Sequence, residues 1–172
     1  MSERGEAGGV KSEPAPKWLS EREMRAWQAL IEVTSGVMAT LDNELQAEHG
    51  LSIGEYEVLV HLSDAPDHSL RMTDLASRLR LSPSGITRRI DGLVRDGLVE
   101  RRQCPSDRRG SNAVLTDEGM SRLSSAAPTH VRGVRAHFLD QLSERQLANL
   151  ASALSAVVID RDAAAGGCDA VA

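Results

Sequence analysis

The segment from Leu81 to Leu115 constrains the fold most, because it carries explicit boundary signals for a helix and then changes its period. Ser82 is suited to an N-cap, Pro83 to the first helical position, and Gly97 to a left-handed stop. The apolar residues between these signals follow the spacing of one helix face and are Ile86, Ile90, Leu93 and Val94. The pattern predicts a helix over residues 83–96 with one buried and one exposed face.

After this helix the pattern changes to short extended runs. Residues 98–103 and 111–115 are predicted to be strands, and the polar residues 104–110 between them a loop. Two short strands joined in this way form a β-hairpin. The sequence therefore predicts a capped helix followed directly by a hairpin, which we call the wing.

Helices are predicted on both sides of this unit. Ser20 and Ser52 each stand three residues before a glutamate, which is the spacing of a capping box. A third, short helix is predicted from Thr73. After the wing, Thr116 and Ser143 are suited to begin two more helices. The first of these is expected to kink or break at its proline and to turn four residues inward, namely Leu123, Val131, Val134 and Phe138.

The first predicted helix carries two apolar stripes side by side. One consists of Trp27, Ile31, Thr34, Met38, Leu41 and Leu45, and the other of Leu30, Val33 and Val37. One stripe suffices to pack a helix on its own domain. The second stripe therefore indicates packing on a further surface, such as a partner subunit.

The predicted fold is mainly α with a small β-hairpin wing. A winged helix-turn-helix over residues 52–115 is flanked by N- and C-terminal helices over residues 18–48 and 117–162, which are the candidates for dimerisation. The N-terminal extension 1–17, rich in Gly, Ser, Glu and Pro, and the tail 163–172 are expected to be disordered.

Charge is distributed unevenly along the chain. The whole sequence has 20 basic and 25 acidic side chains, and its net charge of −5 by itself argues against DNA binding. Residues 71–112, however, hold ten arginines and five acids and are therefore +5, which leaves 10 bases and 20 acids, or −10, elsewhere. A basic module in an acidic scaffold indicates a local site for a polyanion.

The predicted helix at residues 83–96 fits the major groove of B-DNA, which is about 12 Å wide and admits one helix. The N-terminal residues of such a helix meet the base edges. Here these residues are small or form hydrogen bonds, and the expected contacts come from Ser82, Pro83, Ser84, Gly85, Thr87 and Arg88. Arg95, farther along, is expected at a phosphate.

Two arginines, Arg108 and Arg109, lie at the tip of the predicted wing. An arginine held on a hairpin can enter the narrow minor groove, where the negative potential is deepest. Asp107 is placed to orient one of them by an ion pair. Together with the preceding helix, the wing predicts a module that binds double-stranded DNA.

The segment from Leu81 to Gly119 contains Leu81-Ser82, Ile90-Asp91, Leu93, Gly97-Leu98-Val99, Arg102, Asp107-Arg108-Arg109 and Leu115-Thr116 followed by Gly119. In these residues, and in the helix pattern over residues 18–162, the chain resembles the MarR family of winged helix-turn-helix transcriptional regulators. The resemblance implies a homodimer built from the first and the last two helices, a recognition helix at 83–96, and Arg108 and Arg109 in the minor groove. It also implies a regulator, by the family's habit a repressor, that is often released by small anionic aromatic compounds. Two modules one helical turn apart require a pseudo-palindromic operator.

The resemblance also implies an effector pocket, which in many members lies between the dimer helices and the DNA-binding lobe. The chain is also partly similar to the urate-sensing branch of the family. This similarity implies that Glu57 corresponds to the acid of that branch, Arg89 and Arg102 to its arginines, and Trp18 to its tryptophan. The candidates for the pocket lining are Trp18, Arg22, Arg25, Tyr56, Glu57, His61 and Arg89.

Other classes of function have weaker support. The sequence lacks a Gly-rich phosphate loop, a G-x-S-x-G elbow and an H-E-x-x-H pair, so no catalytic residues and no cofactor are predicted. The five histidines are scattered and no Cys/His spacing suits zinc, so no metal is predicted. No apolar run approaches the roughly 18 residues of a membrane span, and the expected location is the cytoplasm.

Two alternatives remain open. A helical protein–protein interaction module would use the flanking helices without the arginines of the wing. A redox-responsive regulator would sense through Cys104, since a modified thiol beside phosphates would clash with DNA, although an exposed loop cysteine without a role is the simpler interpretation.

Overall fold

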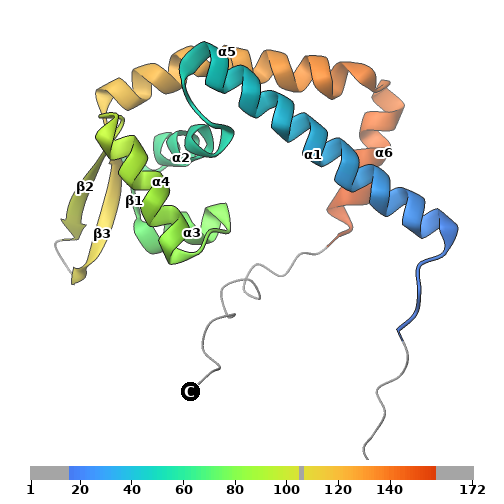
Figure 1. The fold of residues 1–172 in the computed structure, drawn as a ribbon, viewed down its shortest axis with the longest axis horizontal. Coiled ribbons are helices and arrows are strands. Elements are labelled where there is room, and N and C mark those ends of the chain that lie inside the picture. Colours follow the sequence, from blue (N-terminus) through green and yellow to red (C-terminus); the bar gives the residue numbers. More distant parts are fainter. Residues whose placement is uncertain (1–15, 105–106, 158–172) are drawn as a thin grey trace, which may run out of the picture. The chain divides into compact units, whose positions relative to one another are not determined.

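The computed structural model describes residues 16–104 and 107–157, and their side chains except those of residues 104 and 107–109. Figure 1 shows the elements in chain order, α1, α2, β1, α3, α4, β2, β3, α5 and α6. The predicted class, mainly α with a small β wing, is confirmed. Among the described residues, none of the helices has the length and apolar character of a membrane span.

The first of two structural units covers residues 1–34, of which 16–34 are described. It holds the first part of α1 (Glu21–His49), whose predicted capping box is confirmed because the Ser20 backbone N–H donates to Glu23 Oε2 over 2.7 Å. Every described side chain of this unit is exposed. These include apolar residues of both stripes, namely Trp27, Leu30, Ile31 and Val33.

The second unit covers residues 35–172 and holds the buried core. Three helices surround this core, α2 (Ile53–Ser63), α3 (Met72–Leu79) and α4 (Pro83–Arg95), and the predicted capping box at Ser52 is present. The side chains with almost no exposure are aliphatic and include Leu45, Leu59, Leu62, Leu75, Ile86, Ile90, Leu93 and Leu98. The helix-turn-helix formed by α3 and α4 is therefore fixed to α2 by apolar packing.

One residue of α4 does not face the core as predicted. Val94 is 37% exposed, although the other three apolar residues of the predicted face are buried. The helix has 3.6 residues per turn, so a position eight residues after Ile86 lies about 80° round the axis from it. The apolar stripe therefore turns away from the core at its C-terminal end.

The wing belongs to a three-stranded antiparallel sheet with the order β1–β3–β2. β2 (Val99–Cys104) pairs with β3 (Asp107–Leu115), and the other edge of β3 pairs with β1 (Ser69–Arg71). The sequence predicts only the hairpin, because a strand of three residues is too short to show an alternating pattern.

The predicted loop at residues 104–110 is also corrected by the structure. Cys104 pairs with Asp107, and the register shifts between Gln103 and Cys104. A strand ladder is built from backbone groups, which polar residues supply as well as apolar ones. Residues 107–110 therefore belong to β3 and not to a loop.

After the sheet, α5 (Asp117–His137) runs through Pro128 without interruption, so the predicted break does not occur. A proline removes one backbone hydrogen bond, but Ala126 and Thr129 on either side of it are buried and hold the helix in place. Val131 is 55% exposed, and its predicted inward position was wrong. The cause is the same as for Val94, because Val131 lies eight residues after the buried Leu123 and is therefore rotated by about 80° round the helix axis from it.

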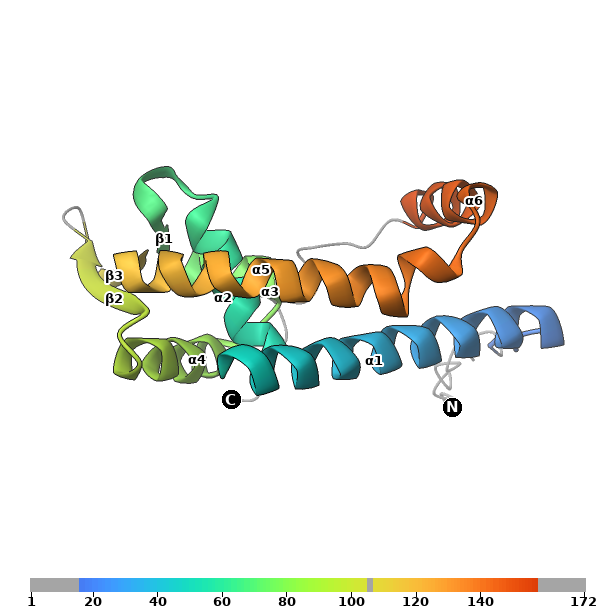
Figure 2. The same ribbon diagram turned by 90° about the horizontal axis from the view of Figure 1, so that it is seen from above.

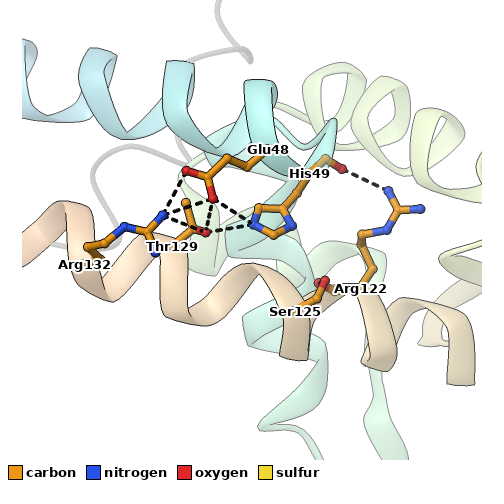
Figure 3. A network of polar contacts seen from close by, with 6 residues as sticks. All are labelled: Glu48, His49, Arg122, Ser125, Thr129 and Arg132. Carbon is orange, nitrogen blue, oxygen red and sulfur yellow. Dashed lines mark hydrogen bonds and ion pairs between the residues drawn. The ribbon is translucent and has the colours of Figure 1, made fainter.

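The last turns of α1 lie beside α5, as Figures 1 and 2 both show, and polar side chains join them. In Figure 3 the Thr129 hydroxyl donates to Glu48 Oε2 over 2.8 Å and lies 2.9 Å from His49 Nε2. Arg132 Nη2 donates to both Glu48 oxygens, at 2.9 and 3.0 Å. The bonds from Thr129 and Arg132 lower the pKa of the Glu48 carboxyl. Arg122 Nη1 adds a bond of 3.0 Å to the His49 carbonyl, so the end of α1 is held on α5.

Candidate nucleic-acid interface

The N-terminus of α4 is capped by a side chain and exposed to solvent. The Gly85 N–H donates to Ser82 Oγ over 3.1 Å, and the Ser84 hydroxyl lies 3.1 Å from the same oxygen. Pro83 stands in the first turn, where its missing N–H costs no helical bond. Since residues 82–84 are exposed, the positive end of this helix is open to an anion such as a phosphate.

The face of α4 opposite the core carries the predicted contact residues. Ser84, Thr87, Arg88 and Arg95 are exposed, and Gly85 is half-buried. Within the described part of the chain, the Arg88 side chain has no hydrogen bond or ion pair, so its guanidinium is available to an outside acceptor. Arg95 Nε lies 4.0 Å from Asp96 Oδ1, and an exposed pair of this kind is weak.

Arg89, in contrast, is directed toward α2. Its Nη1 donates to the Gly54 carbonyl over 3.5 Å, and the guanidinium carbon would lie 2.5 Å from a Cβ at position 54. Only a glycine leaves room for this contact. Arg89 therefore links α4 to α2 through its hydrogen bond to the backbone carbonyl of Gly54.

A further arginine, Arg101 of β2, connects the wing to α4. Its Nη2 lies 2.9 Å from Asp91 Oδ1 and donates to the Thr87 carbonyl over 3.1 Å. Side chains alternate along a strand, so Arg101 lies on the same side of β2 as the buried Val99. Its neighbours Glu100 and Arg102 lie on the other side and form an ion pair over 3.0 Å. This contact was not predicted from the sequence, although the alternation from Val99 was a signal for it. The contact fixes the wing against α4 and neutralises an acid on the exposed face of that helix.

The residues predicted at the wing tip are only partly described. Asp107, Arg108 and Arg109 form the beginning of β3, and Asp107 pairs with Cys104 in the last residue pair of the hairpin ladder. Their side chains and that of Cys104 lie outside the described part of the chain. Their contacts with DNA, and any oxidation of Cys104, remain predictions.

Known proteins share this fold. The family model described as "MarR family" matches residues 51–111. AbsC, a MarR family transcriptional regulator from Streptomyces coelicolor, is 39% identical, with 81% of this chain and 93% of AbsC covered and a TM-score of 0.75. Sco3205, a MarR family transcriptional regulator from the same organism whose structure was solved in complex with DNA, is 36% identical, with 81% and 88% covered and a TM-score of 0.77. The chain belongs to the MarR family.

The chain is therefore a member of a family of DNA-binding transcriptional regulators. The HTH-type transcriptional repressor YetL of Bacillus subtilis (strain 168) is 42% identical over 90 residues, which are 52% of this chain and 54% of YetL. The chain thus spans about half the length of the curated relatives that it first matches.

The effector residues predicted for this MarR-family protein lie in different places. Tyr56, Glu57 and His61 of α2 line a cleft of about 590 Å³ in the second unit. Arg89 is not in its lining, and Arg102 pairs with Glu100 over 3.0 Å. The remaining three candidates are exposed residues of the first unit, namely Trp18, Arg22 and Arg25.

Three polar residues of the cleft were not predicted. Arg78 and Arg80, at the end of α3, and His130 of α5 also line it. The His130 ring lies 4.6 Å from that of Tyr56, and burial lowers the pKa of His130 against an opposing effect of Glu57. Burial also raises the pKa of Tyr56. The sequence offered no signal for this group, because its members come from three separate helices.

Proposed function

We propose that this MarR-family protein is a homodimeric transcriptional repressor that binds a pseudo-palindromic operator and leaves it when a small anionic or aromatic ligand binds. The observation that carries the proposal is the exposed N-terminal face of α4, which Arg101 holds against the wing. Among the described residues, Arg88 on this face has no partner. Small and hydrogen-bonding side chains at a helix N-terminus allow close approach to base edges, and an unpaired arginine suits guanine.

Two similar proteins support this proposal. Sco3205 was solved in complex with DNA, and YetL is named as a repressor. In the proposed complex, α4 lies in the major groove and Arg108 and Arg109 enter the minor groove. Base contacts come from residues 82–88, and phosphate contacts include Arg95.

A second copy of the chain is the proposed partner of the exposed apolar residues. In α6 (Glu144–Ser155) no residue is buried, and Leu147 and Leu154 are 38% and 46% exposed. The apolar stripes of residues 16–34 are exposed as well. Apolar residues repeated along a helix but open to water mark an interaction surface. Two copies would place their recognition helices on half-sites about 10 bp apart.

The test is fluorescence anisotropy of the purified protein with the DNA upstream of its own gene, beside a scrambled duplex of equal length, across a salt series. Tight binding to the upstream duplex alone, with a steep dependence on salt, is the expected result. Equal binding to both duplexes would contradict sequence specificity. No binding to either at low salt would favour the interaction-module alternative.

The wing is tested by Arg108→Ala and Arg109→Ala in the same assay. Each substitution is expected to weaken binding and to reduce the salt slope by about one, because each removes a cation from the DNA. Arg145→Ala, at an exposed position of α6, is the control for the lost charge. Unchanged binding by the double wing variant would exclude the wing from the interface.

A further inference from the structure

The first turn of α2 is bonded to α1 by a carboxylate. The Ile53 N–H, at the start of α2, donates to Asp42 Oδ1 over 2.7 Å, and Asp42 is half-buried. The first N–H groups of a helix have no acceptor inside the helix, and the helix dipole favours a negative charge beside them. The capping box of Ser52 and Glu55 satisfies two further N–H groups here. The beginning of α2 is therefore held at a defined place on α1.

The same turn is also bonded to α4. Arg89 of α4 donates to the carbonyl of Gly54, the residue after Ile53, and its guanidinium lies where a side chain of residue 54 would stand. Gly54 is buried and Arg89 is half-buried. At 3.5 Å the hydrogen bond is long and therefore weak, so the packing of the guanidinium on Gly54 is the main part of the contact. Two successive residues, 53 and 54, thus connect α1 to α4.

Arg89 contacts α2 from one side of α4, and the wing contacts α4 from nearly the opposite side. Successive residues of an α-helix are turned by about 100°, so Arg89 lies about 160° round the axis from Asp91. Asp91 is the residue that Arg101 of the wing binds, over 2.9 Å. Burial of the apolar face alone fixes the rotation of α4 less sharply, because hydrophobic contact is non-directional. The two polar contacts together fix this rotation.

In a dimer, the orientation of α4 determines which operators fit. Since α1 carries the apolar stripes of the proposed dimer contact, residues 53 and 54 join that contact to α4. One base pair more between two half-sites shifts the second half-site by about 3.4 Å along the DNA and about 35° round it. A rigid connection between the dimer contact and α4 therefore accepts one spacing of half-sites, and a loose connection accepts several.

We propose that Asp42 and Arg89 are positioning residues that set the half-site spacing accepted by the dimer. Asp42 places the first turn of α2 on α1, and Arg89 places α4 on that turn. Neither side chain contacts DNA in this arrangement. Gly54 is required because a side chain at its position would displace the Arg89 guanidinium. The spacing role rests on the proposed function.

Gly54→Ala tests the contact without removing a charge. The added Cβ would lie 2.5 Å from the guanidinium carbon of Arg89, which is the far end of a flexible side chain and can move away. Gly92→Ala is the matched control on α4, because its Cβ would lie 3.6 Å from both Arg95 Nη2 and Glu55 Oε1, an ordinary contact distance. Both variants should have melting temperatures close to that of the parent. Hydrogen exchange of the α4 amides should be faster in Gly54→Ala and in Arg89→Gln, but not in Gly92→Ala.

Anisotropy with three duplexes measures the accepted spacing. The upstream operator is compared with versions in which one base pair is inserted or removed between the half-sites. We expect the parent to bind both altered duplexes at least about tenfold more weakly than the operator. Gly54→Ala, Arg89→Gln and Asp42→Ala should bind the operator about threefold or more weakly and discriminate less than about threefold between the duplexes. Their salt slopes should equal that of the parent. Asp42→Asn keeps an oxygen acceptor for the Ile53 N–H and should behave like the parent.

The outcomes separate positioning from other roles. If Gly54→Ala binds all three duplexes like the parent, Arg89 does not position α4. If Arg89→Gln lowers the salt slope by about one while Gly54→Ala leaves it unchanged, Arg89 instead contacts a phosphate. A spacing preference of Asp42→Ala equal to that of the parent would exclude Asp42 from the positioning role. If the parent binds no DNA, or binds every spacing equally, the proposed dimeric regulator fails and the spacing role fails with it. The exchange of the α4 amides then shows independently whether Arg89 holds the helix.

Discussion

At the beginning of α5, Gly119 packs against the backbone where the wing begins. A Cβ at this position would overlap the Leu98 carbonyl oxygen and lie 2.7 Å from Leu115 Cδ1. The Leu98 oxygen also accepts a bond of 3.1 Å from the Thr116 N–H, so it has little freedom to move. Gly119→Ala is expected to lower the free energy of unfolding by roughly 1–3 kcal/mol, measured by urea denaturation.

Gly36 provides the matched control for this substitution. A Cβ at position 36 would have no neighbour within 4 Å, and the residue lies inside α1. Gly36→Ala is therefore expected to stabilise the protein by about 0.5–1 kcal/mol, because alanine is the better helix former. Equal stability of the two variants would contradict the close contact of Gly119 with the wing.

The imidazole of His130 predicts a dependence of stability on pH. Burial lowers its pKa in the folded protein below the ordinary value of 6.5, although Glu57 opposes the shift. As the pH falls through 6.5, the unfolded chain therefore takes up a proton more readily than the folded chain, and the free energy of unfolding decreases. His130→Gln is expected to remove this contribution, so the stability advantage of the parent over the variant should shrink between about pH 7 and pH 5. Parallel stability curves in urea would contradict the shift.

At the scale of elements, the contact of Arg101 with α4 is expected to affect DNA binding more than stability. The pair with Asp91 is partly exposed, with side chains 36% and 58% accessible, and such pairs contribute only about 0.2–1 kcal/mol. Arg101→Gln should therefore leave the melting temperature nearly unchanged. It should weaken operator binding by about threefold or more, because the wing and α4 are no longer held in one orientation. Anisotropy and thermal denaturation measure the two effects.

A double-mutant cycle with Asp91→Asn distinguishes positioning from direct contact. If Arg101 acts by holding α4, its effect and that of Asp91→Asn are not additive. If Arg101 instead contacts a phosphate, Arg101→Gln reduces the salt slope by about one and the two effects add. Arg102→Gln is the matched control, because Arg102 pairs within its own strand, with Glu100. Additive effects would show that Arg101 does not act by positioning α4.

Local signals in the sequence were enough to predict most elements. The caps at Ser20, Ser52, Ser82, Thr116 and Ser143 depend on neighbouring residues only, and the structure contains each of them. Features that depend on distant partners were not predictable in the same way. The strand β1 exists because the edge of β3 accepts it, and His61 and Arg78 line the same cleft because α2 and α3 meet.

The candidate interface shows the same division. The exposed face of α4 follows from its period, which the sequence displays directly. The contact of Arg101 with Asp91 and Thr87 joins a strand to a helix. It could be predicted only with knowledge of how the wing packs on α4. Val94 and Val131 were misplaced because the apolar stripes of long helices drift across the contact with a core of limited width.

At the scale of the whole molecule, the positive charge is concentrated where the proposed DNA surface lies, and most of the exposed apolar residues lie elsewhere. The basic segment 71–112 contains α3, α4 and β2. The exposed apolar residues of α6, in contrast, lie outside that segment. A single module binds DNA without specificity only at about 10⁻⁴–10⁻⁶ M, so two modules held together are needed for a regulator that acts at one operator.

The α6 surface therefore predicts the oligomeric state. Leu147 and Leu154 are seven residues apart on one face of this helix and are both exposed, so Leu147→Asp/Leu154→Asp should bring charges into the proposed dimer contact. Sedimentation velocity is expected to show a dimer for the parent and a monomer for the variant. Ser152→Asp adds a charge to the polar side of the same helix and should remain dimeric. The melting temperature of the parent should rise with protein concentration, because association stabilises the folded state by mass action. A parent protein that sediments as a monomer at micromolar concentration, or a double variant that stays dimeric, would show that this face of α6 does not join two copies.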